Sequence, residues 1–158
     1  MHLEFLVEEP SAEVALQNLV PKILGSGITF NIHVFQGKPD LLKNLPKRLR
    51  GYRNWIPSDW LIFVLLDNDE KNCYDVKFLM EKIVHDEGLT TRSNPNHDGN
   101  FQVINRLAIE ELEAWFFGDV EALRAAYPRI PKNFNSRKKY RNPDSISKTC
   151  EALEHVLK

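Results

Sequence analysis

Apolar and polar positions along the chain repeat first with the period of strands and then with that of helices. Residues 2–8 alternate and then become apolar, which is typical of an opening strand, and residues 28–35 alternate strictly, which predicts a half-buried second strand. Between them, residues 11–24 carry apolar side chains at helical spacing. Residues 61–66 are continuously apolar, and such a run indicates a central parallel strand with both faces covered by helices.

The later part of the chain is predicted to alternate short strands with helices. These elements are expected at residues 73–86 (helix), 89–92 and 101–104 (short strands), and 107–117, 119–127 and 145–158 (helices). The last helix carries no glycine or proline end signal, so we expect the biological chain to continue past Lys158. The order of elements predicts an α/β fold, with a mostly parallel sheet flanked by helices in a single domain over residues 1–158.

Composition narrows the class of protein. Apolar residues make up 42% of the chain and charged residues 27%, which is enough to bury a core and argues against disorder. The longest apolar run is far shorter than the roughly 18 residues of a membrane span. Cys73 and Cys150 lie far apart and form no disulfide framework. We therefore expect reduced thiols, a cytoplasmic location and no membrane partner.

Positive charge is concentrated in two segments, although the formal net charge is −1. The first is a basic insert at about residues 38–57, where Pro39 and Pro46 lead us to expect at most short helices. The second is a basic C-terminal segment at about residues 124–158. The first segment holds the cations Lys38, Lys43, Lys47, Arg48, Arg50 and Arg53, with the aromatic residues Tyr52, Trp55 and Trp60 in it or just after it. Cations beside aromatic residues suit single-stranded or flexible nucleic acid, whereas each segment alone is also typical of a solvated surface.

Acidic residues follow the predicted strands. Asp67 and Asp69 come directly after the apolar run, and residues two apart in extended backbone point to the same side. Glu8 and Glu9 end the first strand, and Glu13 lies one helical turn beyond Glu9. If the two strands are neighbours, these carboxylates converge, and their repulsion favours a bound cation. The oxygen ligands suit Mg²⁺ or Mn²⁺, while the alternative for Asp67 and Asp69 is a polar turn.

A third acidic group consists of Glu110, Glu111 and Glu113. On the helix predicted at residues 107–117, Glu110 and Glu113 share one face and Glu111 turns away from it. Residue chemistry alone favours a solvated face that complements the helix dipole. The aromatic residues that follow, Trp115 and Phe116, are expected in the core.

Several of these motifs resemble known proteins. Leu-Val-Glu-Glu-Pro-Ser, followed by a strand that ends in Leu-Leu-Asp-Asn-Asp, resembles the Toprim fold of topoisomerases, bacterial primases and overcoming-lysogenization-defect nucleases. Three stretches are similar to a bacterial family with a Toprim-like core, domain-of-unknown-function family 4276. They are Glu-Glu-Pro-Ser-Ala-Glu, Phe-Gln-Gly-Lys-Pro-Asp-Leu-Leu-Lys and Ala-Ile-Glu-Glu-Leu-Glu-Ala-Trp-Phe-Phe-Gly-Asp. The resemblance extends over essentially the whole chain.

The resemblance implies a Toprim-like, Rossmann-like fold and roles for several acids. Asp67 and Asp69 correspond to the magnesium pair of Toprim enzymes, and Glu8 or Glu9 to the glutamate that acts as general acid or base. The Pro-Ser that follows favours Glu8, and Glu9 then stands where Toprim proteins usually have glycine. The acid four residues later in nucleases of this fold favours Glu9 with Glu13 instead.

The same nucleases draw a later acid into a second metal site, which makes Glu111 or Glu113 a candidate ligand, and Lys38 is a candidate for neutralising a phosphate. We therefore expect Mg²⁺- or Mn²⁺-dependent hydrolysis of phosphodiester bonds in DNA or RNA. The resemblance further implies an ATPase partner in a bacterial phage-defence system, and self-association is left open. The alternatives are a non-catalytic adaptor that binds a partner ATPase or nucleic acid, and phosphoryl or nucleotidyl transfer on a small nucleotide.

Overall fold

The computed structural model describes residues 1–25, 27–68 and 72–158 of the chain. The helices and strands are β1 (His2–Val7), α1 (Pro10–Leu24), β2 (Thr29–Val34), α2 (Lys38–Arg53), β3 (Trp60–Asn68), α3 (Cys73–Asp86), β4 (Val103–Ile109), α4 (Ala114–Gly118), α5 (Val120–Ala126) and α6 (Thr149–Leu157). Two short 3₁₀ helices lie at Phe134–Ser136 and Pro143–Ser145. In this described part of the chain, none of the helices combines the length and the apolar character needed to cross a membrane.

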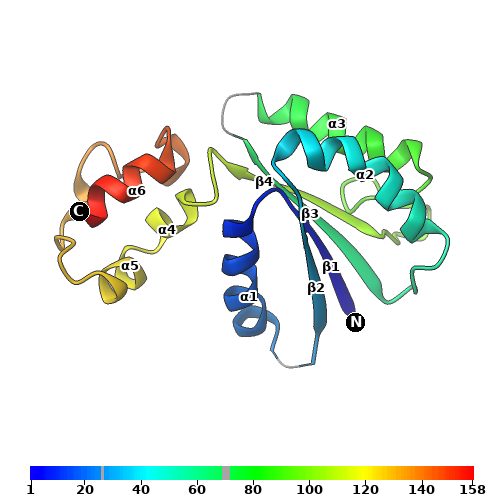
Figure 1. The fold of residues 1–158 in the computed structure, drawn as a ribbon, viewed down its shortest axis with the longest axis horizontal. Helices are drawn as coiled ribbons and strands as arrows, with labels where there is room; N and C mark the ends of the chain where they lie inside the picture. Colours follow the sequence, from blue (N-terminus) through cyan, green and yellow to red (C-terminus); the bar gives the residue numbers. More distant parts are fainter. Residues whose placement is uncertain (26, 69–71) are drawn as a thin grey trace. The chain divides into compact units, whose positions relative to one another are not determined.

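The four strands form one parallel sheet in the order β2-β1-β3-β4, which confirms the predicted α/β class. Strand β1 pairs with β2 from His2↔Thr29 to Val7↔Val34, and on its other side with β3. Helix α1 covers one face of the sheet, and α2 and α3 cover the other (Figure 1). All six residues of β1 are buried, as expected for a strand between two neighbours and two helical layers.

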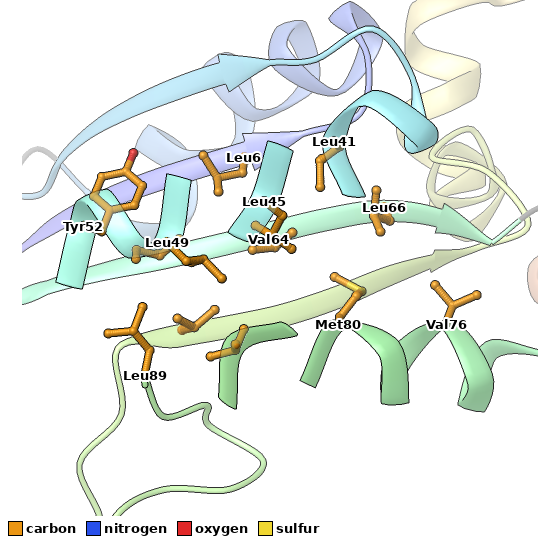
Figure 2. Packing of buried hydrophobic residues seen from close by; sticks show 13 residues of the cluster. Leu6, Leu41, Leu45, Leu49, Tyr52, Val64, Leu66, Val76, Met80 and Leu89 are labelled. Atoms are coloured by element: carbon orange, nitrogen blue, oxygen red, sulfur yellow. The ribbon is translucent and has the colours of Figure 1, made fainter. Parts of the chain in front are cut away.

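Helix α2 is a continuous helix of 16 residues that packs on the sheet beside α3. The prediction of an insert with at most short helices is therefore wrong. Its residues Leu41, Leu45 and Leu49 are completely buried and recur at helical spacing. They pack with Leu6, Val64 and Leu66 of the sheet and with Val76 and Met80 of α3, as Figure 2 shows.

The two prolines that favoured short helices are both accommodated in α2. Pro39 lies in the first turn, where a missing N–H removes no helical hydrogen bond. Pro46 lies inside the helix, where proline costs about 3 kcal/mol. Burial of three leucines stabilises the helix by more than that, at about 1.5–3 kcal/mol each.

The contacts within the chain divide it into two compact units. The first comprises Met1–Leu66 and Cys73–Leu107 and contains most of the sheet. The second comprises Asp67–Asn72 and Ala108–Lys158, with its own apolar cluster. In that cluster Tyr140 stacks on Phe134 and Phe117, with ring centroids 4.3 Å and 5.7 Å apart.

The helix predicted at residues 107–117 is wrong for its first half. The strand predicted at residues 101–104 continues instead as β4 to Ile109, and α4 begins only at Ala114. The chain turns at Glu110, which has a φ of 63°. Trp115 and Phe116 were expected in the core, but they are 44% and 42% exposed, because the short helix turns only Ala114 and Phe117 inward.

Candidate functional site

The carboxyl end of β1 is fixed to the loop that precedes α2. The N–H of Phe35 donates to the carbonyl oxygen of Val7, and the N–H of Gly37 donates to that of Glu8, both at 3.0 Å. Gly37 has a φ of 86°, a conformation that favours glycine, and Lys38 begins α2 directly after it. The half-buried Glu8 therefore has its main chain beside the start of α2.

Glu9 lies between β1 and α1 in extended backbone, with φ −149° and ψ 165°. Its carboxylate accepts a hydrogen bond of 2.5 Å from the hydroxyl of Ser11. Any residue adopts this extended conformation. An acid in place of the glycine expected from the Toprim resemblance therefore causes no backbone strain.

Glu13 lies in the first turn of α1 and is half-buried. Its carboxylate accepts a hydrogen bond of 3.2 Å from the side-chain amide of Gln17, one turn further along the helix. The three glutamates predicted as site residues thus follow one another along the end of β1 and the start of α1.

Asp67 is the penultimate residue of β3, which extends to Asn68, whereas the sequence predicted a strand that ends before Asp67. Asp69 lies outside the described residues, so the Asp67–Asp69 metal pair stays a prediction. Asn68 forms an isolated antiparallel bridge with Glu110. Both residues belong to the second unit.

Glu111 has a structural partner in the second unit. Its carboxylate accepts hydrogen bonds from the hydroxyl of Thr149 at 3.0 Å and from the N–H of Cys150 at 2.8 Å. Thr149 and Cys150 are the first two residues of α6, so the carboxylate of Glu111 caps the N-terminus of that helix. Glu113 directly precedes α4, and Glu110 and Glu113 do not share a helical face as predicted, because Glu110 lies outside any helix.

Within the described ranges, no group of three or more His, Cys, Asp or Glu side chains could hold a metal ion. The predicted ligands Asp67, Glu8, Glu9 and Glu13 offer carboxylate oxygens alone, a donor set that suits Mg²⁺ or Mn²⁺. The chemistry of these residues therefore fits the expected metal.

Four of the six cations of α2 form two pairs with different surroundings. Arg50 forms two hydrogen bonds with the carboxylate of Glu87, of 2.9 Å and 2.8 Å, and Arg53 donates to the carbonyl oxygen of the same residue at 3.1 Å. These two arginines therefore join α2 to the end of α3. Lys47 and Arg48 instead lie exposed on the side of α2 that meets β2.

A buried carboxylate, Glu4, was missed by the sequence analysis. It lies in the middle of β1 and is only 3% exposed. Its Oε1 accepts hydrogen bonds of 2.9 Å from His2 Nε2 and from Asn31 Nδ2. Its Oε2 accepts hydrogen bonds of 2.7 Å from the hydroxyl of Tyr52 and 2.5 Å from His33 Nε2. Both oxygens of the carboxylate are therefore satisfied by side chains.

This network fixes the charge of Glu4. Burial alone would raise the pKa of Glu4, but the hydrogen bonds, with that from Tyr52 first among them, lower it to about 2. The pKa of Tyr52 is raised by its burial and by the hydrogen bond to Glu4. Glu4 is therefore ionised and Tyr52 protonated across the neutral pH range.

The network reaches the surface through His33 and Arg48. Arg48 Nη2 donates to His33 Nδ1 at 2.7 Å, and because arginine offers only donors, Nδ1 is the acceptor. The proton of the imidazole then lies on Nε2, which donates to Glu4. A directed series of hydrogen bonds thus runs from Arg48 through His33 to Glu4.

A groove with a volume of about 500 Å³ opens at this point between β2 and α2. We call it the β2–α2 groove; it is lined by His33, Val34, Phe35, Asn44, Lys47, Arg48, Gly51, Tyr52 and Trp55. All of these residues belong to the first unit.

Strand register explains why the network was missed. The pairing His2↔Thr29, Glu4↔Asn31 and Leu6↔His33 places alternate polar residues of two strands on one face. Each strand alone shows only a few polar residues in an apolar pattern. A search for polar residues at matching positions of two strands expected to be neighbours could have found Glu4, Asn31 and His33.

Comparisons with known proteins give one finding. The family described as Domain of unknown function (DUF4276) matches residues 7–158. Neither the comparison with curated proteins nor that with solved structures gives a match. The family match agrees with the resemblance of the acidic motifs, whereas nothing found confirms the more distant similarity to Toprim enzymes.

Proposed function

The chain belongs to the DUF4276 family, a domain of unknown function that matches residues 7–158, and we propose that it is a Mg²⁺-dependent nuclease of the Toprim type. The reaction is hydrolysis of a phosphodiester bond in DNA or RNA. Bound Mg²⁺ would polarise the phosphate and lower the pKa of the attacking water.

One observation supports this proposal above the others: β1 and β3 are neighbouring parallel strands, in register from His2↔Trp60 to Val7↔Leu65. Glu8 follows the last residue of β1, and Asp67 is one of the last residues of β3. In open α/β sheets, ligands bind outside the carboxyl ends of the strands. The acidic residues thus follow the strand ends where such a site is expected.

The proposed roles keep the residues named from the sequence. Asp67 and Asp69 hold the metal, and Glu8 or Glu9 acts as general base or as ligand of a second ion. Lys38, at the start of α2, neutralises substrate charge. Glu13, Glu111 and Glu113 remain candidates for the second ion.

The structure also offers support for the alternative, a non-catalytic adaptor that binds a partner ATPase or nucleic acid. Two acids of the predicted set have local structural partners: Glu9 is bonded by Ser11, and Glu111 by Thr149 and Cys150. An acid retained to cap a helix needs no metal to explain it.

The setting of the reaction is part of the same proposal. Two cysteines far apart in the sequence, Cys73 and Cys150, suit a protein of the reducing cytoplasm. The resemblance to nucleases that work with an ATPase supports such a partner in a bacterial defence system.

The experiment is a cleavage assay on single- and double-stranded DNA and RNA, with Mg²⁺ or Mn²⁺, using the chain alone and the chain with its candidate ATPase. The test variant is Asp67→Ala with Asp69→Ala. A matched control, Asp98→Ala with Glu121→Ala, removes two exposed carboxylates elsewhere.

We expect cleavage by the wild type, a loss of at least about a hundredfold in the test variant, and wild-type rates in the control. Metal-independent cleavage would contradict the proposal, as would equal activity of the test variant. Absence of cleavage under every condition, together with tight binding of nucleic acid, would favour the adaptor.

A further inference from the structure

The β2–α2 groove carries two cations, Lys47 and Arg48, on its lining. Within the part of the chain that the structure describes, neither Lys47 nor Arg48 forms an ion pair, and both side chains are exposed. Arg48 uses one N–H on His33 and keeps its other donors for a ligand. The buried Glu4 keeps its negative charge, which its hydrogen-bond donors stabilise, and Arg48 contacts it only through His33. The groove therefore presents two cations to an anionic group.

An exposed indole lies in the same groove. Trp55 follows the end of α2 and is 56% exposed, which is unusual for such a large apolar side chain. Its ring is held by Trp60 and Tyr52, with centroids 5.5 Å and 5.6 Å away. A fixed indole with an open face is suited to stacking on a nucleobase.

Gly51 leaves the space between the cations and this indole open. Glycine inside a helix costs about 1 kcal/mol relative to alanine. A Cβ atom at this position would meet no atom within 4 Å, so close packing does not require glycine here. Gly51 thus lines the groove without a side chain, and the space beside it is open.

From these three features we infer that the β2–α2 groove binds a nucleotide, with its phosphate at Lys47 and Arg48 and its base on Trp55. The groove volume of about 500 Å³ lies within the range of pockets for ligands of this size. The ligand is a free nucleotide or one nucleotide of a single strand. If the ligand is a nucleotide of single-stranded nucleic acid, the inference rests on the proposed nuclease function. Binding in the groove itself requires no metal.

The first test measures binding without metal, in EDTA. Fluorescence anisotropy follows a labelled oligothymidylate, and calorimetry follows adenosine monophosphate. The variant Lys47→Ala with Arg48→Ala is compared with Lys22→Ala with Arg92→Ala, which removes the same charge from exposed positions elsewhere. We expect the Kd to rise by at least about tenfold in the first variant and by less than about twofold in the second. Equal weakening of both would overturn the inference, because the attraction would then depend on total charge alone.

The second test fills the groove without removing charge. Gly51→Phe places a ring in the open space, whereas Gly51→Ala leaves most of it free and favours the helix. We expect Gly51→Phe to lose binding by about tenfold or more and Gly51→Ala to bind as the wild type does. Unchanged binding by Gly51→Phe, with its helix content intact by circular dichroism, would overturn the inference.

Comparing the two ligands tells whether the groove binds a nucleotide of a single strand or a free nucleotide. The variant Asp67→Ala with Asp69→Ala distinguishes failure of the groove from failure of the proposed metal site. Binding of the oligothymidylate at least tenfold tighter than the monophosphate identifies a strand; equal affinity identifies a free nucleotide; binding of neither overturns the inference. The variant Asp67→Ala with Asp69→Ala should bind as the wild type does in EDTA. If it cleaves as fast as the wild type, the proposed metal site fails while the groove stands.

Discussion

Strand β1 carries acidic residues in two contrasting settings. In its middle, Glu4 is buried and bonded by four side chains from β1, β2 and α2. Glu8 and Glu9 directly follow the carboxyl end of the strand and are half-buried. The first carboxylate is part of the folded core, whereas the second group lies partly exposed where the strand ends.

The contrast shows that the position of an acid along a strand does not by itself indicate its role. A buried carboxylate is tolerated only when its hydrogen bonds replace the water it has lost. Glu4 meets that condition in the isolated fold. Glu8 and Glu9 are only half-buried, so water replaces part of what Glu4 obtains from side chains.

Removing Glu4 should have the largest effect on stability. Glu4→Ala leaves Tyr52, Asn31 and two histidines without their acceptor. Each buried donor left without its partner costs about 1–3 kcal/mol, and Tyr52 and His2 are both buried, so we expect a loss of several kcal/mol. Urea unfolding at neutral pH measures the change in the free energy of unfolding. A cost below about 1 kcal/mol would show that the network does not hold the sheet and α2 together.

Acid should remove the same stabilisation in the wild type. The pKa of Glu4 is about 2 in the folded chain and has an ordinary value of 4.5, so the folded state binds the proton less readily than the unfolded state. Its contribution is complete above about pH 4.5 and is lost as the pH falls toward 2. Glu4→Gln cannot titrate, so the free energy of unfolding should fall less between pH 5 and 3 than in the wild type. Parallel curves for the two proteins would contradict this.

Tyr52→Phe should cost less than removal of Glu4 itself. The carboxylate keeps three donors but loses the hydroxyl bonded at 2.7 Å. A lost hydrogen bond to a buried charge costs about 1–3 kcal/mol. The effect should be seen in urea unfolding and should nearly vanish in a Glu4→Ala background, where the partner is already gone. Full additivity of the two variants would argue against a direct interaction.

Glu9→Ala should have the smallest effect, about 0.5 kcal/mol, since only the hydrogen bond from Ser11 is lost. The same measurement applies. A cost as large as that of Glu4→Ala would remove the contrast between the two settings and make Glu9 a structural residue.

Local patterns were enough to predict much of the first unit. The helix expected at residues 73–86 has those bounds, because an apolar stripe and a stop at Gly88 coincide there. The continuous run at residues 61–66 forms the interior of β3. In both segments the local preference and the tertiary environment agree.

Elsewhere tertiary packing overrode the local signal. Pro46 is accepted inside α2 because a stripe of leucines packs on the sheet. The chain after Leu107 continues as β4, although its sequence also suits a helix. Glu4 is recognised as a site only when strand register brings Asn31 and His33 beside it. Glu8 follows β1 directly, as the apolar pattern indicates, but a metal site at the strand ends stays a prediction.

The central claim is that Asp67 and Asp69 bind a divalent metal, and titration calorimetry with Mg²⁺ and Mn²⁺ tests it most directly. The wild type should bind the ion. Glu4→Gln, which changes only the buried hydrogen-bond network in the middle of β1, should bind it as well. Asp67→Ala with Asp69→Ala should not bind it. Equal binding by the wild type and the double variant, or no binding by the wild type with nucleic acid and its partner present, would contradict the account.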